Sequence, residues 1–548
     1  MIHKAQIINR NNHFLGQDVL DEENEILKRT GFTGSSGMLI VAENKSYLLV
    51  DGRYEIQAKK QTTIETVCPK YGINTNWILD NFAPDAEVEY NPWTISAKEI
   101  KDYKHLFPKM TFIAKPELKP TAKASTFEHE LKYTGKSFAE KIKEFTDIIK
   151  LTGIDAYIIT AADSVSWLTN LRSNALPHSP IIRAFAIVTV GGTVTLFADN
   201  LEHKGFDIRP LSEIETELKK HKSLGWQDNA TPAAIVDMLD KHHIKHKNLI
   251  NPCVSIKSLK NPTEINGFIH AHTRDGVAVC SFLCWLENNW KGKTELDIVK
   301  KLQEFRKQQK DYYSDSFSTI AATDANAAIV HYRPEPATNQ KLGKLLLLDS
   351  GAQYFDGTTD ATRTIALQKP SKEAIEKFTT VLKAHIALAS AKFPRKVKGI
   401  QLDTICRSQM WKQGLDYAHG TGHGVGHFLN VHEGPQSMNT TNTAPILENM
   451  VLSIEPGYYE ENKFGIRIEN LAYVPEIEDK LCFSILTLVP IDKTLINAKL
   501  LDKEEINWLN HYHKTVFAHL FKHLGKKERE WLKNACAPLV SKAEKCKT

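Results

Sequence analysis

Short apolar runs separated by polar turns predict two β-hairpins in the first half of the chain. One hairpin covers residues 37–54 (GMLIVAENKSYLLVDGRY) and the other covers residues 183–200 (RAFAIVTVGGTVTLFADN). Helical patterns follow both, as in residues 211–221 (LSEIETELKKH), and a new amphipathic helix begins near Tyr133 after a Lys/Pro-rich link. The repetition indicates two related α/β domains with a boundary near Tyr133.

A strong helix start opens the second half of the chain. Asn261 is suited to cap a helix, Pro262 to occupy its first position and Glu264 its third. Near the C-terminus, residues 504–532 (EEINWLNHYHKTVFAHLFKHLGKKEREWL) predict a basic amphipathic helix. We expect the histidines and lysines of that helix to lie on a solvated face.

Two aspartates in the second half stand at the ends of apolar or β-prone runs. Asp349 follows four leucines, and Asp360 precedes the β-prone TRTIAL. On two paired strands these carboxylates would lie side by side, where they repel each other unless a cation or a shared proton lies between them. The alternative is that each aspartate only caps a turn.

Two glutamates occupy similar positions. Glu455 ends the apolar strand MVLSI, and Glu469 lies in FGIRIENLAYV, where isoleucines alternate with Arg467 and Glu469. Acidic side chains are seldom buried without a partner. Glu469 therefore has a buried partner, or this segment is an edge strand with one wet face.

Four histidines and five glycines occupy residues 419–434 (HGTGHGVGHFLNVHEG). A metal site, a catalytic site and a glycine-rich loop with solvated histidines are all consistent with this stretch alone. Four carboxylates and one histidine suit Mn²⁺, Co²⁺ or Zn²⁺, and their number favours two ions roughly 3.5–4 Å apart that hold a hydroxide. The glycines would let the backbone approach such a crowded centre. H-E-x-x-H and G-x-S-x-G are absent, which argues against a single-zinc protease and a serine hydrolase.

Composition narrows the class of protein only slightly. The 548 residues, 42% hydrophobic and 25% charged, are typical of a globular protein of about three domains. The net charge of +5 is too weak to predict nucleic-acid binding. No apolar stretch resembles a signal peptide or a membrane span, so we expect a cytoplasmic protein with no membrane partner. The eight cysteines form no C-x-x-C pair and are expected to be reduced thiols.

Five motifs follow one another in the second half: LLDSG, DGTTDATRT, HGTGHGVGHFLNVHEGP, IEPGYY and FGIRIEN. Their order and spacing resemble the pita-bread metallopeptidases of family M24. Further blocks resemble the long, three-domain form of Xaa-Pro aminopeptidase (aminopeptidase P), among them GFTGSSG, DGRY, WLTNLRSNALPHSP, NPTEINGF and IVHYRPEP. The resemblance implies an α/β (α+β) chain. Creatinase-like domains would cover residues 1–130 and 131–255, and a pita-bread catalytic domain with a helical C-terminal extension would cover residues 256–548.

The resemblance also implies roles for individual residues. The residues that match metal ligands, with Asp360 and Glu469 as bridges, are Asp349, Asp360, His423, Glu455 and Glu469. Those that match catalytic groups are His331, His419, His432 and Glu455. Those expected to contact substrate are His331, His423, His432 and Arg467. His427 matches no functional position, and we expect it to be a solvated or locally bonded loop histidine.

The implied activity is that of a metalloaminopeptidase. It would release the first residue of peptides with proline in the second position, by attack of a hydroxide that bridges two divalent ions. Mn²⁺ is the first candidate, with Co²⁺ or Zn²⁺ as alternatives, and a homodimer is expected. The rival functions are a prolidase-like enzyme limited to Xaa-Pro dipeptides and an inactive pita-bread scaffold used for binding. The presence of all five ligand positions argues against the scaffold.

Overall fold

The computed structural model of the chain describes residues 1–540 except 17, 70–73 and 120–123. The chain forms two compact units. The first contains Met1–Leu131, Lys136–Leu176 and Pro180–Lys257, and the second contains Lys132–Gly135, Pro177–Ser179 and the chain from Ser258 onward. Within the described residues, no helix combines the length and apolar character needed to cross a bilayer.

The first unit contains two six-stranded sheets with the same topology, in the orders β4-β3-β2-β1-β5-β6 and β12-β11-β10-β8-β13-β14. In both, antiparallel pairs join the second, third and fourth strands, and the remaining pairs are parallel. The two predicted hairpins are confirmed as β2–β3 and β10–β11. The repeat in the sequence therefore reflects two related α/β folds.

The strands of the first sheet are β1 (Ile2–Asn9), β2 (Met38–Ala42), β3 (Ser46–Leu49), β4 (Glu65–Val67), β5 (Phe82–Tyr90) and β6 (Thr111–Ala114). Those of the second are β8 (Ala156–Ile159), β10 (Phe185–Thr189), β11 (Val194–Phe197), β12 (Asp207–Arg209), β13 (Ser223–Trp226) and β14 (Lys245–Asn248), and β7 (Thr126–Glu128) pairs with β9 (Leu171–Ser173). The helices in this part of the chain are α1 (Glu25–Thr30), α2 (Glu55–Gln61), α3 (Asn74–Asn81), α4 (Ala97–Leu106), α5 (Leu131–Thr134), α6 (Phe138–Lys150), α7 (Ala162–Thr169), α8 (Ile214–Leu218), α9 (Ala233–Lys241) and α10 (Pro252–Ser258).

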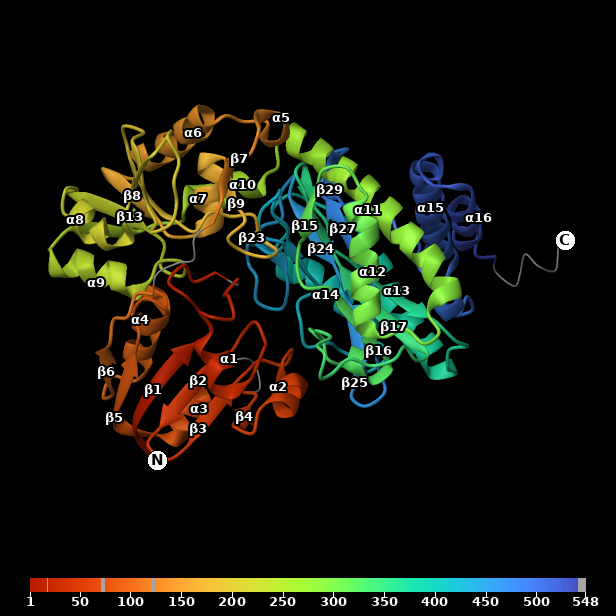
Figure 1. Cartoon of the computed structure of the whole chain (residues 1–548), viewed down its shortest axis with the longest axis horizontal. Helices are drawn as coiled ribbons and strands as arrows, with labels where there is room; N and C mark the ends of the chain where they lie inside the picture. Colours follow the sequence, from red (N-terminus) through yellow and green to blue (C-terminus); the bar gives the residue numbers. More distant parts are fainter. Residues whose placement is uncertain (17, 70–73, 120–123, 541–548) are drawn as a thin grey trace. The chain divides into compact units, whose positions relative to one another are not determined.

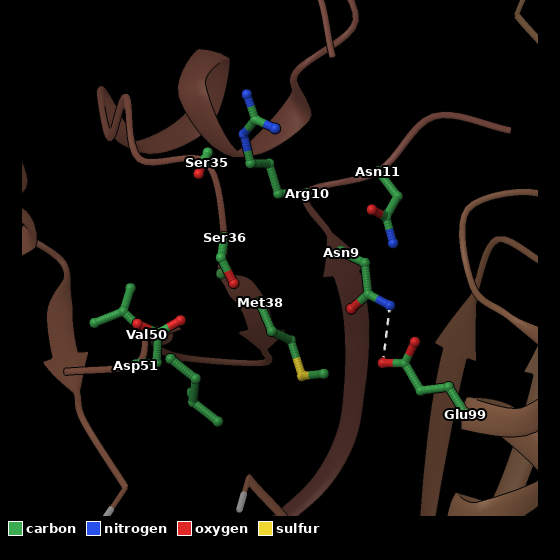
Figure 2. Close-up of a pocket in the computed structure, with 11 residues that line it drawn as sticks. Asn9, Arg10, Asn11, Ser35, Ser36, Met38, Val50, Asp51 and Glu99 are labelled. Atoms are coloured by element: carbon green, nitrogen blue, oxygen red, sulfur yellow. Dashed lines mark hydrogen bonds between the residues drawn. The ribbon is translucent and has the colours of Figure 1, made fainter. Parts of the chain in front are cut away.

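A polar cavity of about 260 Å³ lies in the first unit (Figure 2). Ser35 and Ser36 of the GFTGSSG motif and Asp51 of DGRY line it together with Arg10. Asn9 also lines the cavity, and its side-chain amide donates to Oε1 of Glu99 at 3.0 Å. The two N-terminal motifs are therefore parts of one polar surface.

The long helix α11 (Pro262–Asn289) opens the second unit and crosses in front of its strands in Figure 1. Its predicted start is confirmed. Asn261 Oδ1 accepts from the Glu264 backbone N–H at 3.0 Å, Glu264 Oε2 accepts from the Asn261 N–H at 2.9 Å, and Pro262 stands at the first position. The other helices of this unit are α12 (Glu295–Lys307), α13 (Lys372–Ala389), α14 (Gly399–Trp411), α15 (Lys503–Leu520) and α16 (Lys526–Ala535).

Two sheets and a hairpin of the second unit carry the acidic and histidine motifs. The three-stranded sheet contains β16 (Ile320–Thr323), β17 (Leu345–Ser350) and β20 (Ala361–Ala366). The five-stranded sheet contains β23 (Glu433–Met438), β22 (Gly422–Gly424), β24 (Val451–Ile454), β27 (Asn470–Tyr473) and β30 (Ser484–Ile485), and β25 (Gly457–Glu460) pairs with β26 (Phe464–Arg467). The remaining strands are β15 (Tyr312–Asp315), β18 (Ala352–Tyr354), β19 (Gly357–Thr358), β21 (Lys392–Phe393), β28 (Glu476–Ile477) and β29 (Lys480–Cys482).

One apolar cluster packs these strands against the helices. Ile454, Ile466 and Ile468 are fully buried in it together with Phe378 of α13 and Leu509 of α15. Burial of each such side chain contributes about 1.5–3 kcal/mol. The strand ends beside Glu455 and Glu469 are thus anchored by the core.

Three expectations from the sequence need correction or refinement. FGIRIENLAYV is two strands, β26 and β27, because the chain passes from one sheet to another at Ile468 and Glu469. Its residues 464–472 are all buried, which excludes the edge strand with a wet face.

On α15, His511 and His519 are exposed as expected, but His513 is fully buried. The seven cysteines in the described residues are free thiols, and Cys546 lies outside them.

Candidate metal centre

The two aspartates lie together because β17 and β20 pair in antiparallel register. Asp349 lies opposite Thr362, and Asp360 directly precedes β20. Both side chains are nearly buried, with 8% of Asp349 and 5% of Asp360 exposed. The two aspartates are therefore neighbouring buried carboxylates. The alternative that each of them only caps a turn is wrong.

His423 lies between Asp360 and Glu455. Its Nε2 lies 3.5 Å from Asp360 Oδ2 and 3.6 Å from Glu455 Oε1. Its Nδ1 is 2.9 Å from the carbonyl oxygen of Gly424 and must donate to it, because a carbonyl only accepts. This bond leaves Nε2 as the electron-pair donor that faces the carboxylates.

Glu469 completes the cluster from the break between β26 and β27. Its backbone N–H donates to the Thr362 carbonyl at 3.1 Å, and its Oε2 accepts from the Thr362 hydroxyl at 2.7 Å. One side-chain atom from each of Asp360, His423 and Glu469 lies within 4.8 Å of the others. The motifs therefore converge on one site although they are far apart in the sequence.

Burial and mutual repulsion of the carboxylates favour the binding of positive charge at this cluster. Burial first, and then repulsion from Asp349 and Glu455, raises the pKa of Asp360 well above its usual range. Burial and repulsion from Asp360 likewise raise the pKa of Glu469, and burial raises that of Glu455. Oδ1 of Asp349 and Oδ1 of Asp360 are buried without a hydrogen-bond partner among the described residues. Unpartnered carboxylate oxygens beside an imidazole nitrogen fit divalent cations.

Arg467 compensates part of this negative charge. Only 1% of it is exposed, and its Nη2 donates to Asp349 Oδ2 at 2.5 Å. Its Nη1 donates to the Tyr459 hydroxyl at 2.7 Å and to the Val330 carbonyl at 3.3 Å, and its Nε donates to Thr362 Oγ1 at 3.1 Å. All three nitrogens thus have partners in the protein. This placement makes Arg467 a buried support of Asp349, and the substrate contact expected for it stays a prediction.

Tyr459 connects Arg467 to His419. Nδ1 of His419 donates to the Gly420 carbonyl at 2.8 Å, so the neutral ring accepts at Nε2 from the Tyr459 hydroxyl at 2.9 Å. Burial raises the pKa of Tyr459 to about 12, so its hydroxyl is protonated at neutral pH, as that of an ordinary tyrosine is. His419 is therefore the end of a chain of hydrogen bonds that begins at Asp349.

The remaining histidines differ in their surroundings. His432 is exposed, and its ring centroid lies 4.2 Å from that of His423 at an interplanar angle of 72°. His331 follows Val330, whose carbonyl accepts from Arg467, and is half-buried. His427 is only 3% exposed, its Nε2 donates to the Asp356 carbonyl at 2.9 Å, and its ring meets Phe268 edge-on at 5.5 Å. The expectation of a solvated or local role for His427 is wrong, because its partners come from distant segments.

The glycines of residues 419–434 have a role in strand packing. A Cβ atom at Gly422 would lie 2.0 Å from the Ser453 carbonyl oxygen, and one at Gly424 would lie 2.4 Å from the Glu433 carbonyl oxygen. Side chains there would push β22 away from β23 and β24. The close approach that the glycines permit is therefore between neighbouring strands, and it brings His423 to the cluster.

Three supporting residues were not identified from the sequence. Tyr459 lies in IEPGYY, Thr362 lies in DATRT, and Ser453 donates from Oγ to Glu455 Oε1 at 3.1 Å while it accepts from the His423 backbone N–H at 2.9 Å. Tyr459 and Thr362 lie within the motifs named above, and Ser453 directly precedes IEPGYY. Their polar side chains beside acidic or histidine residues were the available signal.

Sequence models of known families match most of the chain. The "Metallopeptidase family M24" model matches residues 267–476, and the model of the "C-terminal region of peptidase_M24" matches residues 479–539. Two models described as "Creatinase/Prolidase N-terminal domain" match residues 29–117 and 115–264.

Two curated relatives and a solved structure match almost the whole chain. It is 36% identical to Xaa-Pro aminopeptidase 1 of Dictyostelium discoideum, over 95% of this chain and 91% of that protein. It is also 36% identical to aminopeptidase P2 of Arabidopsis thaliana, over 93% and 82% respectively. The crystal structure of the X-prolyl aminopeptidase from Caenorhabditis elegans, described as a cytosolic enzyme with a di-nuclear active site, is similar with a TM-score of 0.91 and 31% identity, over 98% of this chain and 95% of that one.

Glu469→Gln should have opposite effects on the metal-free and metal-loaded protein. In the metal-free fold the pKa of Glu469 is raised well above its ordinary value of 4.5, so its favourable contribution is complete below pH 4.5 and is lost as pH rises through the folded pKa. We expect the metal-free variant to have a higher Tm than the metal-free wild type at pH 8. After metal loading, its Tm should be lower and its metal content should fall below two equivalents.

Thermal scans at pH 5 and pH 8, with and without chelator, and elemental analysis test this prediction. Glu504→Gln, on the exposed first turn of α15, is the control and should leave both forms unchanged. Two full metal equivalents in Glu469→Gln, or equal loss of Tm in both forms, would contradict the role of Glu469 in the cluster.

Proposed function

This chain belongs to metallopeptidase family M24, among the Xaa-Pro aminopeptidases, and on that premise we propose that it releases the first residue of peptides with proline in the second position. The observation that carries the proposal is the largely buried cluster of Asp349, Asp360, His423, Glu455 and Glu469, in which two aspartate oxygens have no partner among the described residues. We also propose a three-part division, with two creatinase-like domains that end near residues 130 and 255.

The five residues of the cluster would hold two divalent ions, with Mn²⁺ as the first candidate and Co²⁺ or Zn²⁺ as alternatives. When bound, such ions supply a nucleophile at neutral pH and polarise the scissile carbonyl. We propose Asp360 and Glu469 as the ligands that both ions would share. The cluster contains four carboxylates against one guanidinium, and this excess of three negative charges is more than one divalent ion would neutralise.

The residues around the cluster have separable tasks. Asp349 would bind the free α-amino group of the substrate, which makes the enzyme an aminopeptidase. Glu455, whose pKa is raised by burial, would accept a proton from the nucleophile and deliver it to the leaving imino nitrogen. His432, exposed beside His423, would donate to the carbonyl oxygen as negative charge develops there.

His331, His419 and Arg467 would complete the site. His331 would line the pocket that receives the reacting group. His419 has both ring nitrogens engaged, so we assign it the task of holding Tyr459, and Arg467 that of holding Asp349 and Tyr459. Proline has no N–H and a fixed φ, so a dedicated pocket is required for it.

The long form of the chain favours an aminopeptidase over a prolidase. The aminopeptidase relatives match over more than nine-tenths of the chain, whereas the prolidase from Pyrococcus horikoshii covers 64% of it, with a TM-score of 0.54 and 24% identity. A cytoplasmic location and a homodimer remain part of the proposal. The description of the Caenorhabditis elegans enzyme as cytosolic supports the location.

Peptide hydrolysis tests the proposed specificity. Ala-Pro-Ala should be cleaved with a kcat/KM about 100-fold above that for Ala-Ala-Ala, because the pocket accepts a ring without an N–H. Arg-Pro-Pro should also be cleaved, whereas an enzyme limited to dipeptides would prefer Gly-Pro. Equal kcat/KM values for Ala-Pro-Ala and Ala-Ala-Ala would refute the Xaa-Pro assignment.

Three histidine variants separate metal binding from catalysis. His423→Ala should lose both metal and activity. His432→Ala should keep its metal and lose about 10²–10³ in kcat, the usual effect of removing one donor to an oxyanion. His427→Ala should keep metal and rate but lower the Tm, since a buried hydrogen bond to Asp356 is lost.

Metal content, steady-state rates and thermal scans are sufficient for this comparison. His427→Ala is the matched control, because it removes a histidine from the same glycine-rich segment. If His432→Ala loses its metal while His423→Ala keeps two equivalents, the assigned roles are wrong.

A further inference from the structure

Arg363 is a buried cation whose hydrogen bonds all end on neutral oxygens in the described structure. It is 4% exposed and lies on β20, three residues after Asp360. Its Nε donates to the carbonyls of Val489 and Pro490 at 3.3 and 3.1 Å. Its Nη1 donates to the carbonyls of Thr362 and Glu469, and its Nη2 donates to Asn470 Oδ1, the Val489 carbonyl and the Tyr512 hydroxyl.

Burial of a cation without a carboxylate partner is costly. The planar fork of a guanidinium offers five N–H donors, so a single arginine side chain can join several backbone segments. Here it joins β20, the Glu469–Asn470 segment, the Val489–Pro490 segment and α15. The placement of Arg363 thus ties the C-terminal region of the chain to the metal centre.

Glu469 is the residue that this arrangement holds most directly. Its backbone N–H donates to the Thr362 carbonyl at 3.1 Å, and its own carbonyl accepts from Arg363 Nη1 at 2.6 Å. Both peptide groups of Glu469 are therefore bound to one short stretch of β20. The backbone of Glu469 is therefore held in place, and its side chain can move only by rotation about its χ angles.

Asn470 extends the same contacts toward Glu455. Its Oδ1 accepts from Arg363 Nη2 at 2.7 Å, and its Nδ2 donates to Nε2 of the buried His385 at 2.9 Å. In the five-stranded sheet Asn470 lies opposite Ile454, the residue before Glu455. Arg363 thus supports the strand ends that carry two members of the carboxylate cluster.

Tyr512 supplies the contact from α15. Its hydroxyl accepts from Arg363 Nη2 at 2.7 Å and donates to the Val489 carbonyl at 2.7 Å. Its ring stacks on Trp508 with centroids 5.5 Å apart and an interplanar angle of 9°. The inward face of α15 is therefore bound to the residues that support Glu469.

We propose that Arg363 and Tyr512 are positioning residues that hold Glu469, and with it the metal centre, in its binding geometry. The inference rests on the proposed metal binding at Glu469. It assigns to helix α15 a part in metal affinity, through the chain Tyr512–Arg363–Glu469. Tyr512 and Arg363 contact neither metal nor substrate and act through the Glu469 backbone.

Two variants test the proposal. Tyr512→Phe removes only the hydroxyl, and we expect half-occupancy to require about tenfold more free Mn²⁺. Arg363→Lys keeps the charge but loses the fork, and we expect a loss in Mn²⁺ affinity of about 10- to 100-fold. For both, the rise in Tm on adding Mn²⁺ should be smaller than in wild type, and excess Mn²⁺ should restore kcat while KM stays unchanged.

Tyr157→Phe is the matched control. Tyr157 is buried in the first unit, and its hydroxyl donates to the Leu249 carbonyl at 2.8 Å. We expect Tyr157→Phe to lower the Tm without changing the Mn²⁺ concentration for half-occupancy. A purely structural role for Tyr512 predicts the same behaviour.

The readouts are occupancy in buffered Mn²⁺, measured by equilibrium dialysis, and thermal scans with and without Mn²⁺. If Tyr512→Phe behaves like Tyr157→Phe, the proposal is overturned, whether or not Arg363→Lys folds. If the wild-type protein binds two ions but does not cleave Xaa-Pro peptides, only the substrate assignment is refuted. A wild-type protein that binds no divalent ion would overturn both.

Discussion

Repulsion among buried carboxylates is the constraint on which the second unit depends. Asp349, Asp360 and Glu469 are nearly buried, Glu455 is half-buried beside them, and Arg467 compensates only one of their charges. Without further positive charge the cluster favours protonation, as the raised pKa values of Asp360 and Glu469 indicate. Repulsion among these carboxylates therefore destabilises the metal-free fold, and bound cations relieve the repulsion. For this reason the site is specific for cations.

The rest of the unit holds the carboxylates against that repulsion. The strand ends emerge from one apolar cluster, which gives their backbones little freedom. Arg467 fixes Asp349, Thr362 fixes Glu469 through both its hydroxyl and its carbonyl, and Ser453 links His423 to Glu455. Such contacts orient ligands before any ion binds, which lowers the free energy required to form the site.

Much of this was predictable from the sequence because local patterns determined it. The two hairpins, the capped start of α11 and the apolar strands that end in acidic residues all depend on neighbours in the chain. Their repetition indicated two related domains, and the motif order indicated the family. The side-by-side aspartates followed from the pairing of β17 with β20.

The partners of buried polar side chains were not predictable in the same way. His427 bonds to Asp356, His513 is buried on a helix with a polar sequence, and Arg467 is directed onto Asp349. Each of these depends on segments distant in the sequence, and no periodicity reports such contacts. Likewise, nothing in the HGTGHG pattern distinguished glycines that admit a metal from glycines that let β22 approach β23 and β24.

Infrared difference spectroscopy at pH 6 tests most directly whether the carboxylates depend on cations. At this pH an ordinary Asp or Glu is ionised. The metal-free protein should show the C=O band of protonated carboxylic acids, shifted in D₂O, and this band should disappear when Mn²⁺ is added. No such band in the metal-free protein, with an unchanged spectrum in the acid region after metal addition, would contradict the account.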